Sequence, residues 1–140
     1  MDQVTENLFV TKAVELLDLA DDNEFEEIIS LCYRDHLGLE QPEPTTTENK
    51  FVFPDGPHDY DIFEAAVDYT IESLERGNKT LVHCQAGVSR SPGVCIAAIA
   101  VRENIDVEEA RSRVKEARPV TNPTSEVWGS TVQYIVENTT

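Results

Sequence analysis

Short apolar runs alternate along the chain with longer segments in which apolar residues recur every three or four positions. The short runs are typical of buried strands and lie at residues 8–10, 28–33, 51–53 and 80–84. The longer segments have helical spacing and cover residues 13–20, 62–75, 91–104, 107–117 and 123–135. Because strands that alternate with helices form parallel sheets, the pattern predicts an α/β fold with a central, mostly parallel sheet and helices on both faces.

Local signals predict where the helices begin and which side chains they bury. Ser91 is placed as an N-cap with Pro92 at the first helical position, and Asp106 with Glu109 forms a capping box for the next helix. The helix over 91–104 is apolar on nearly every side, so we expect it to be central. The first helix is expected to turn Val14 inward, and the proline- and threonine-rich residues 38–50 are expected to form a surface loop.

Two of the predicted strands deliver cysteines to one edge of the sheet. The strand over 80–84 ends in Cys84, and Cys32 closes the strand that passes through residue 30. Ligands of parallel sheets bind at the carboxyl ends of the strands, so both thiols are expected near the ligand. Cys32 is therefore a candidate redox partner of Cys84, and the alternative is a plain buried cysteine.

The length of the chain and its cysteines constrain its class. A chain of 140 residues suffices for one domain with its own core, so we expect a single domain over residues 1–140. The three cysteines show no C-x-x-C spacing, and His36, His58 and His83 show no paired metal-ligand spacing. The N-terminus does not resemble a leader, and the longest apolar run is about half a membrane span. These features predict a soluble, cytoplasmic, monomeric protein without a metal or other cofactor.

The charge balance excludes two classes of partner. The chain has 27 acidic and 11 basic residues and a formal net charge of −16. Nucleic acids and anionic membranes require cationic neutralisation, so neither is expected as a partner. The acids are spread along the chain, which indicates either adaptation to a high-salt cytoplasm or an ordinary acidic protein.

The stretch "HCQAGVSRS", residues 83–91, has the composition of an anion-binding loop. A loop of small residues between a strand and a helix N-terminus directs backbone N–H groups at an anion, and Gly87 lets the backbone turn. The same amides would stabilise a Cys84 thiolate and make it a nucleophile. Arg90 can hold two oxygens of a tetrahedral oxyanion at once. The predicted phosphate-binding residues are Gln85, Ala86, Gly87, Val88, Ser89 and Arg90.

These residues closely resemble the His-Cys-x5-Arg-Ser signature of the protein tyrosine phosphatase superfamily, and "AGVSRS" is most similar to its dual-specificity branch. The stretches "ENLFV", "IISLC", "FPDG" and "ARPVTNP" also occur in the order that this family has them. The resemblance implies hydrolysis of phosphorylated proteins through a phosphocysteine at Cys84, with Arg90 and the loop amides binding the transition state. It further implies that Ser91 assists the departing thiolate, a role compatible with that of a helix cap, and that His83 positions the loop.

A separate acid must protonate the leaving group, because the thiolate cannot donate a proton. "FPDGPHDYD" offers Asp55, Asp59 and Asp61. Asp55 lies in the Pro-Asp-Gly context that resembles the mobile acid loop of the family, whereas the other two could equally cap the following helix. Asp55 is therefore the predicted general acid.

Two positions depart from the family pattern. Thr124 and Glu126 stand where the family often has an asparagine and a glycine, so the contacts of these positions to the catalytic loop are left open. A chain of 140 residues is also not expected to have room for the long N-terminal extension that tyrosine-specific members of the family carry. This implies a shallower pocket that accepts phosphoserine and phosphothreonine as well as phosphotyrosine.

Two other functions remain as alternatives. A phosphoinositide or small-molecule phosphomonoesterase would favour lysines in the loop, where Gln85, Ala86 and Val88 are uncharged. A phosphate-binding module without turnover would keep the cradle but would not need the nucleophile and the acid.

Overall fold

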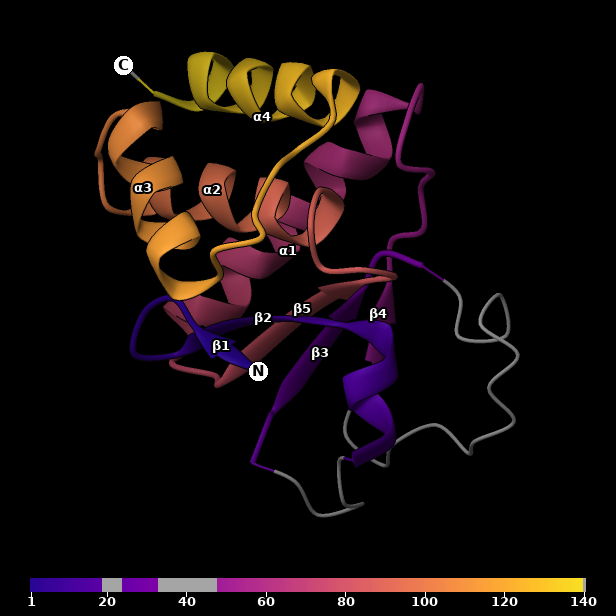
Figure 1. The fold of residues 1–140 in the computed structure, drawn as a ribbon. Coiled ribbons are helices and arrows are strands. Elements are labelled where there is room, and N and C mark those ends of the chain that lie inside the picture. Colours follow the sequence, from indigo (N-terminus) through magenta and orange to yellow (C-terminus); the bar gives the residue numbers. More distant parts are fainter. Residues whose placement is uncertain (19–23, 33–47, 140) are drawn as a thin grey trace.

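The computed structural model describes residues 1–18, 24–32 and 48–139. A five-stranded sheet in this part of the chain has the order β1-β2-β5-β3-β4, as Figure 1 shows. The strands are β1 (Asp2–Gln3), β2 (Leu8–Lys12), β3 (Glu27–Ser30), β4 (Glu48–Lys50) and β5 (Thr80–Cys84). Only β1 pairs antiparallel with its neighbour, and the other three pairings are parallel. The predicted mostly parallel sheet is confirmed.

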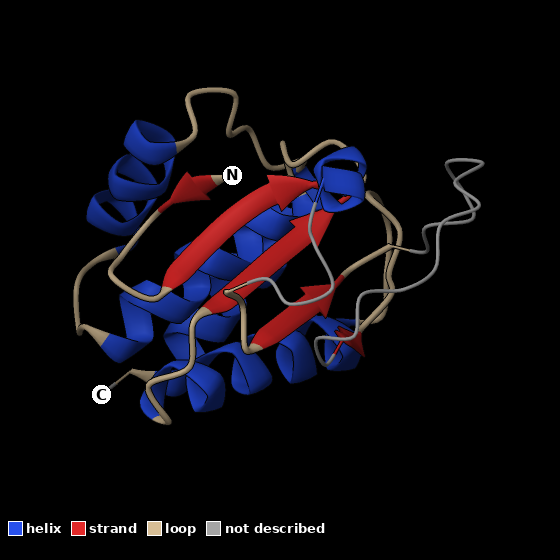
Figure 2. Cartoon of the chain, turned by 90° about the horizontal axis from the view of Figure 1, so that it is seen from below, coloured by secondary structure: helices blue, strands red, loops and turns tan. Residues whose placement is uncertain are grey.

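The described part of the chain has four α-helices on one side of the sheet, and a short 3-10 helix covers part of the other face (Figures 1 and 2). The α-helices are α1 (Tyr60–Glu75), α2 (Arg90–Arg102), α3 (Val107–Ala117) and α4 (Ser125–Asn138), and the 3-10 helix is η1 (Ala13–Asp18). Residues 91–100 of α2 are all buried, because α1, α3 and α4 surround this helix. The central helix predicted from its apolar sequence is therefore confirmed.

Alternation along the strands divides the core between the two faces of the sheet. Val10, Ile29 and Val82 join the core beneath the α-helices. Ile28 and Leu81 face the opposite side, where Leu16 of η1, Phe25 and Phe9 cover them. Both faces of β3 and β5 are therefore buried, which accounts for their continuous apolar sequence.

The helix predicted after the first strand differs from the one observed. η1 has three residues per turn, so Ala13 and Leu16 share the face turned to the protein, and both are buried. Val14, which was expected inside, is 46% exposed. The α-helical period assumed for this segment was wrong.

Other boundaries also shift. Most of the loop predicted over 38–50 lies outside the described residues. Its last three residues were expected in the loop but form β4. The pairing of β4 with β3 continues beyond the strand, because the Phe51 N–H donates to the Ser30 carbonyl. The N-cap of α2 is Ser89 and not Ser91. The last helix begins at Ser125, two residues beyond the predicted start at Pro123, because the Thr124 side chain caps it by accepting from the Val127 N–H.

Candidate active site

The loop of residues 85–89 connects β5 to α2 at the carboxyl edge of the sheet. This is the edge at which the sequence places the anion-binding loop. Gly87 has φ +66°, a left-handed conformation that glycine adopts without steric cost. The turn of the loop therefore depends on a residue that the sequence singled out.

Every carbonyl oxygen of this loop accepts a hydrogen bond from a donor outside it. The Ala13 N–H reaches the Gln85 carbonyl at 3.2 Å, the Asn122 N–H reaches Val88 at 2.7 Å, and the Gly93 N–H reaches Ser89 at 2.9 Å. The Arg118 guanidinium takes the remaining two, with Nη2 on Ala86 at 3.2 Å and Nε on Gly87 at 2.5 Å. The donors come from the first residue of η1, from α2, and from the segment between α3 and α4.

These contacts orient the amides of the loop. In a trans peptide the N–H points opposite to the carbonyl of the same plane, and no described peptide is cis. Because the carbonyls face outward, the N–H groups of Ala86, Gly87, Val88, Ser89 and Arg90 face the other way, toward the interior of the loop. Converging amides at a helix N-terminus favour an anion, so the predicted cradle has a structural cause.

Arg118 is a supporting residue that the sequence analysis did not single out. Its side chain is buried, and its Nη1 also donates to Asp2 Oδ2 at 2.8 Å. A buried guanidinium needs such partners to offset the loss of hydration. The available signal was the stretch "ARPVTNP", which contains both Arg118 and Asn122.

Cys84 lies at the base of the loop, with 2% of its surface exposed. Ser91 contacts its sulfur twice, through the backbone N–H at 3.4 Å and through Oγ at 3.1 Å. Ser91 is inside α2, so its hydroxyl is not needed as a cap and is directed at the thiol. The structure thus brings together the predicted nucleophile and the predicted hydroxyl partner.

Arg90 is the first residue of α2 and reaches across to the acid loop. Its Nη1 donates to the Phe53 carbonyl at 2.8 Å and to the Leu31 carbonyl at 3.4 Å. Its Nε is buried and has no partner among the described residues. Nη1 therefore binds carbonyl oxygens of the protein itself, and Nε is left to donate to a ligand oxygen.

Asp55 lines a pocket of about 410 Å³, and Asp59 is not among the residues that line this pocket. Asp59 instead caps α1 by accepting from the Asp61 N–H at 3.0 Å. Asp55 Oδ1 accepts from the Thr124 hydroxyl at 3.3 Å. The pocket is lined by Cys32, Val52, Phe53, Pro54, Asp55, Gln85 and Arg90.

The other predicted residues surround this arrangement. His83 is fully buried in β5, and its Nε2 lies 2.6 Å from Ser30 Oγ in the adjacent strand β3, which places it where it can position the loop. Cys32 lines the pocket, as the strand topology predicts. Cys95 of α2 is a further buried thiol: burial raises its pKa, and the nearby Cys84 adds to the rise.

The two positions that depart from the family pattern behave differently. Thr124 contacts the loop, since its backbone N–H donates to Ser89 Oγ at 2.8 Å. Glu126 is exposed, and the contact recorded for its carboxylate is with the neighbouring Ser125 hydroxyl. The threonine therefore contacts the phosphate-binding loop, whereas the glutamate is exposed and contacts its neighbour in α4.

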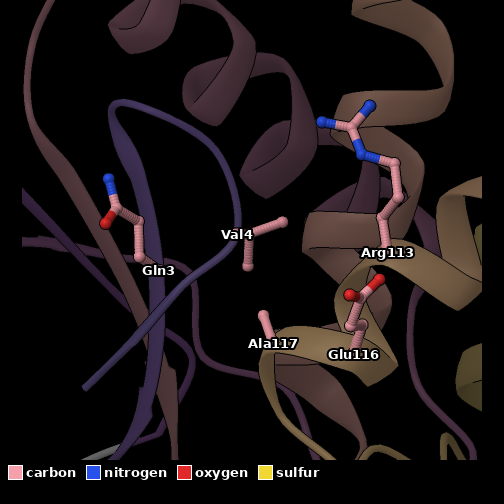
Figure 3. A pocket seen from close by; sticks show the side chains of 5 residues that line it. All are labelled: Gln3, Val4, Arg113, Glu116 and Ala117. Carbon is pink, nitrogen blue, oxygen red and sulfur yellow. The ribbon is translucent and has the colours of Figure 1, made fainter.

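A second hollow, of about 310 Å³, lies between the N-terminal residues and α3 (Figure 3). Its Arg113 is paired with Glu103 at 2.7 Å, so its charge is already compensated, and none of the loop residues lines it. Within the described ranges, no group of three or more histidine, cysteine or acidic residues is arranged to hold a metal ion. None of the helices described combines the length and apolarity needed to cross a membrane.

A cysteine beneath an amide cradle, with an arginine at its far end, is the arrangement of the cysteine-dependent phosphatases. The chain belongs to the dual-specificity branch of this superfamily, because the family model "Dual specificity phosphatase, catalytic domain" matches residues 56–137. Dual specificity protein phosphatase 5 of Rattus norvegicus is 36% identical over 88 residues, 61% of this chain and 23% of that protein. Dual specificity protein phosphatase 18 of Pongo abelii is 28% identical over 77% of this chain and 53% of that protein. The chain thus spans about half or less of the length of these curated relatives.

Solved structures share the fold at lower sequence identity. The human tyrosine phosphatase-like serine/threonine/tyrosine-interacting protein superposes with a TM-score of 0.83 at 22% identity, covering 98% of this chain and 96% of its own. Human DUSP28 gives a TM-score of 0.79 at 22% identity, with 98% and 96% covered. These likenesses confirm the fold.

Replacing Gly87 by alanine should weaken phosphate binding by about tenfold or more, equivalent to about 1.4 kcal/mol. An added Cβ would lie 2.6 Å from Arg118 Nη2 at a backbone φ of +66°. Arg118 would have to leave the Ala86 and Gly87 carbonyls, and the loop amides would lose their common direction. Vanadate inhibition or calorimetric phosphate binding measures the effect.

Gly77→Ala is the matched control for this prediction. Gly77 also has a left-handed φ, of +78°, but an added Cβ would meet nothing within 4 Å. This variant should lose about 1 kcal/mol of stability through backbone strain alone and bind phosphate normally. Wild-type phosphate affinity in Gly87→Ala would show that Arg118 does not hold the loop in its binding conformation.

Proposed function

We propose that this chain hydrolyses phosphomonoesters of proteins through a phosphocysteine, acting on phosphotyrosine and also on phosphoserine and phosphothreonine. The observation that carries the proposal is the position of Cys84 at the base of a loop whose five carbonyls are all bound from outside. The amides turned inward can hold three phosphoryl oxygens while the sulfur approaches phosphorus. Electrostatic stabilisation of this kind is the main source of catalysis in phosphoryl transfer.

In the first step the Cys84 thiolate forms a bond to phosphorus as the bond from phosphorus to the leaving oxygen breaks. Asp55 gives its proton to that oxygen, so tyrosine or serine leaves as the neutral alcohol. Arg90 supports this step in two ways. Its Nε is directed to the substrate, and its Nη1 holds the Phe53 carbonyl beside the acid. A lysine could not make both contacts.

In the second step water attacks the phosphocysteine, and inorganic phosphate is released. The Asp55 carboxylate accepts the proton of that water, and the Cys84 sulfur departs as a thiolate. Ser91 supports the departing sulfur, since its N–H lies at 3.4 Å and its Oγ at 3.1 Å. Two donors at the sulfur stabilise the negative charge that returns to it.

The lining of the pocket favours protein substrates over polyanionic lipids or small molecules. Arg90 is the only cation among the described residues that line it, and Val52, Phe53 and Pro54 give it an apolar wall. An apolar wall suits the ring of phosphotyrosine, whereas a phosphoinositide would bring further phosphates with no described cation to meet them.

The proposal includes a monomeric protein that works in the cytoplasm and binds neither nucleic acid nor membranes. A reducing compartment keeps the Cys84 thiol available. The net charge of −16 disfavours polyanionic surfaces. The same charge, spread over the chain, is the basis of the high-salt interpretation, and an ordinary acidic protein is the alternative.

Hydrolysis of p-nitrophenyl phosphate tests the proposal directly. The wild-type chain should turn over this substrate and be inhibited by vanadate. Cys84→Ser should lose turnover and retain its circular dichroism spectrum, because an alcohol is not appreciably ionised in this cradle. Vanadate-sensitive turnover that survives in Cys84→Ser would assign the nucleophile elsewhere, and phosphate binding without any turnover in the wild type would favour the binding module.

Asp55→Asn should slow phosphotyrosine hydrolysis by roughly a hundredfold, the usual range for general acid catalysis. It should matter little for kcat/KM of p-nitrophenyl phosphate, because this constant reports the first step alone and the leaving group is stable as an anion. A series of aryl phosphates should therefore show a steep dependence on leaving-group pKa in the variant, together with loss of the basic limb of the pH profile.

Asp59→Asn is the control for the acid. Asp59 caps α1, and asparagine caps nearly as well as aspartate, so the loss of stability should stay under about 1 kcal/mol. Its leaving-group dependence should remain that of the wild type. If the two variants exchange these behaviours, Asp59 is the acid and Asp55 is not.

We further propose that Cys32 is the redox partner of Cys84, because Cys32 lines the pocket that Gln85 and Arg90 also line, and Cys84 directly precedes that loop at the end of β5. Peroxide would oxidise the Cys84 thiolate to a sulfenic acid with release of water, and the Cys32 thiol would then displace a second water to form the disulfide. Peptide mapping after peroxide treatment should show a Cys32–Cys84 link, and Cys95→Ala should leave it unchanged. Overoxidised Cys84 beside a reduced Cys32 would refute the pairing.

A further inference from the structure

Thr124 connects three parts of the site. Its hydroxyl donates to Asp55 Oδ1 at 3.3 Å in the acid loop. Its backbone N–H donates to Ser89 Oγ at 2.8 Å in the phosphate-binding loop, and Ser89 Oγ lies 3.4 Å from Thr124 Oγ1. The Val127 N–H of α4 donates to the same threonine oxygen at 3.4 Å. One side chain thus joins the acid, the cradle and a helix N-terminus.

The direction of these hydrogen bonds follows from the number of protons available. A threonine hydroxyl has one proton to donate and two lone pairs to accept with. The lone pairs receive the Val127 N–H and the Ser89 hydroxyl, so the single proton is left for the Asp55 carboxylate. The Ser89 oxygen accepts the Thr124 N–H through a lone pair. The Ser89 hydroxyl proton is therefore still available to donate to Thr124 Oγ1. The hydrogen bonds therefore run from donor to acceptor in one direction, from Ser89 through Thr124 to the Asp55 carboxylate.

Apart from Thr124, few contacts fix the orientation of the Asp55 carboxyl. Asp55 is exposed, and Thr124 makes the only hydrogen bond to its carboxylate within the described part of the chain. The neighbouring contacts fix the backbone of the acid loop instead. Arg90 Nη1 binds the Phe53 carbonyl, and His58 Nδ1 binds the Gly56 carbonyl at 2.7 Å. Without Thr124 the loop could stay in place while the carboxyl turns among its rotamers.

We infer that Thr124 is a positioning residue for the general acid. By donating to Oδ1, it leaves Oδ2 as the oxygen that carries the transferable proton, and it holds that oxygen toward the leaving group. The inference rests on the proposed function, and it deepens it by assigning a role to a position where the sequence departs from the family pattern. Thr124 acts through Asp55 and does not itself touch the phosphoryl group.

Thr124→Val tests this role, because valine keeps the shape and the backbone N–H but lacks the hydroxyl. The specificity constant for phosphotyrosine should fall roughly three- to tenfold, the worth of one ordinary hydrogen bond. The specificity constant for p-nitrophenyl phosphate, which reports the first step alone, and inhibition by vanadate should stay unchanged, because this leaving group needs no acid and the N–H still supports Ser89. Thr124→Ser restores the hydroxyl and should restore phosphotyrosine turnover.

Asp106→Ala is the matched control for loss of a helix cap. Asp106 caps α3 by accepting from the Glu109 N–H at 2.8 Å, as Thr124 caps α4, but it has no contact recorded to the site. This variant should lose comparable stability and keep the ratio of the two substrates. A changed ratio in Thr124→Val alone therefore reports the hydroxyl's action on Asp55.

A double variant identifies the path of the effect. Adding Thr124→Val to Asp55→Asn should cause no further loss on phosphotyrosine, because no acid is left to position. Equal losses on both substrates, or a full additional loss in the double variant, would overturn the inference.

NMR coupling constants between the Hα and Hβ protons of Asp55 keep the test separate from the proposed function, because they report the side-chain rotamer. Loss of the contact should change the couplings from those of one χ1 rotamer to averaged values in Thr124→Val and not in Asp106→Ala. A wild-type chain that turns over neither substrate would refute the proposed function, and the couplings would still decide on the contact. Unchanged couplings in Thr124→Val, together with unchanged substrate preference where turnover is measured, would refute the positioning role.

Discussion

The site depends on hydrogen bonds made to the outside of the loop at residues 85–89. Five carbonyl oxygens point away from the pocket because donors from η1, α2 and the segment after α3 hold them there. Planar peptides then direct the N–H groups inward. Neither the Cys84 thiolate nor a phosphoryl group could be stabilised here if these peptides turned over, since carbonyl oxygens would then face both negative charges.

This constraint explains why residues far from the pocket belong to its chemistry. Arg118 holds two of the carbonyls and pairs with Asp2, so the first strand and the end of α3 are tied to the same loop. Local dipoles matter more in this chain because its net charge of −16 repels anions at long range. Binding must therefore come from short-range contacts, and the inward amides with Arg90 supply them.

The sequence predicted the parts of the site that lie close together along the chain. Cys84, Gly87 and Arg90 fall within one strand-loop-helix unit, whose periodicity and small residues are visible locally. Arg118 was not found this way, because its partners lie 31 and 116 residues away and nothing in its immediate sequence requires them. The Pro-Asp-Gly context favoured Asp55 over Asp59 as the acid, and the geometry adds that Asp59 is occupied as the cap of α1. Val14 was misplaced because the apolar pattern was interpreted with an α-helical period, whereas the segment is a 3-10 helix.

A crystal structure of the chain with vanadate would test the account most directly. We predict vanadium bonded to Cys84 Sγ, its equatorial oxygens bound by the N–H groups of residues 86–90 and by Arg90 Nε, and the loop carbonyls still held by Arg118 and Asn122. Vanadate bound elsewhere, or loop peptides turned so that carbonyl oxygens enter the pocket, would contradict it.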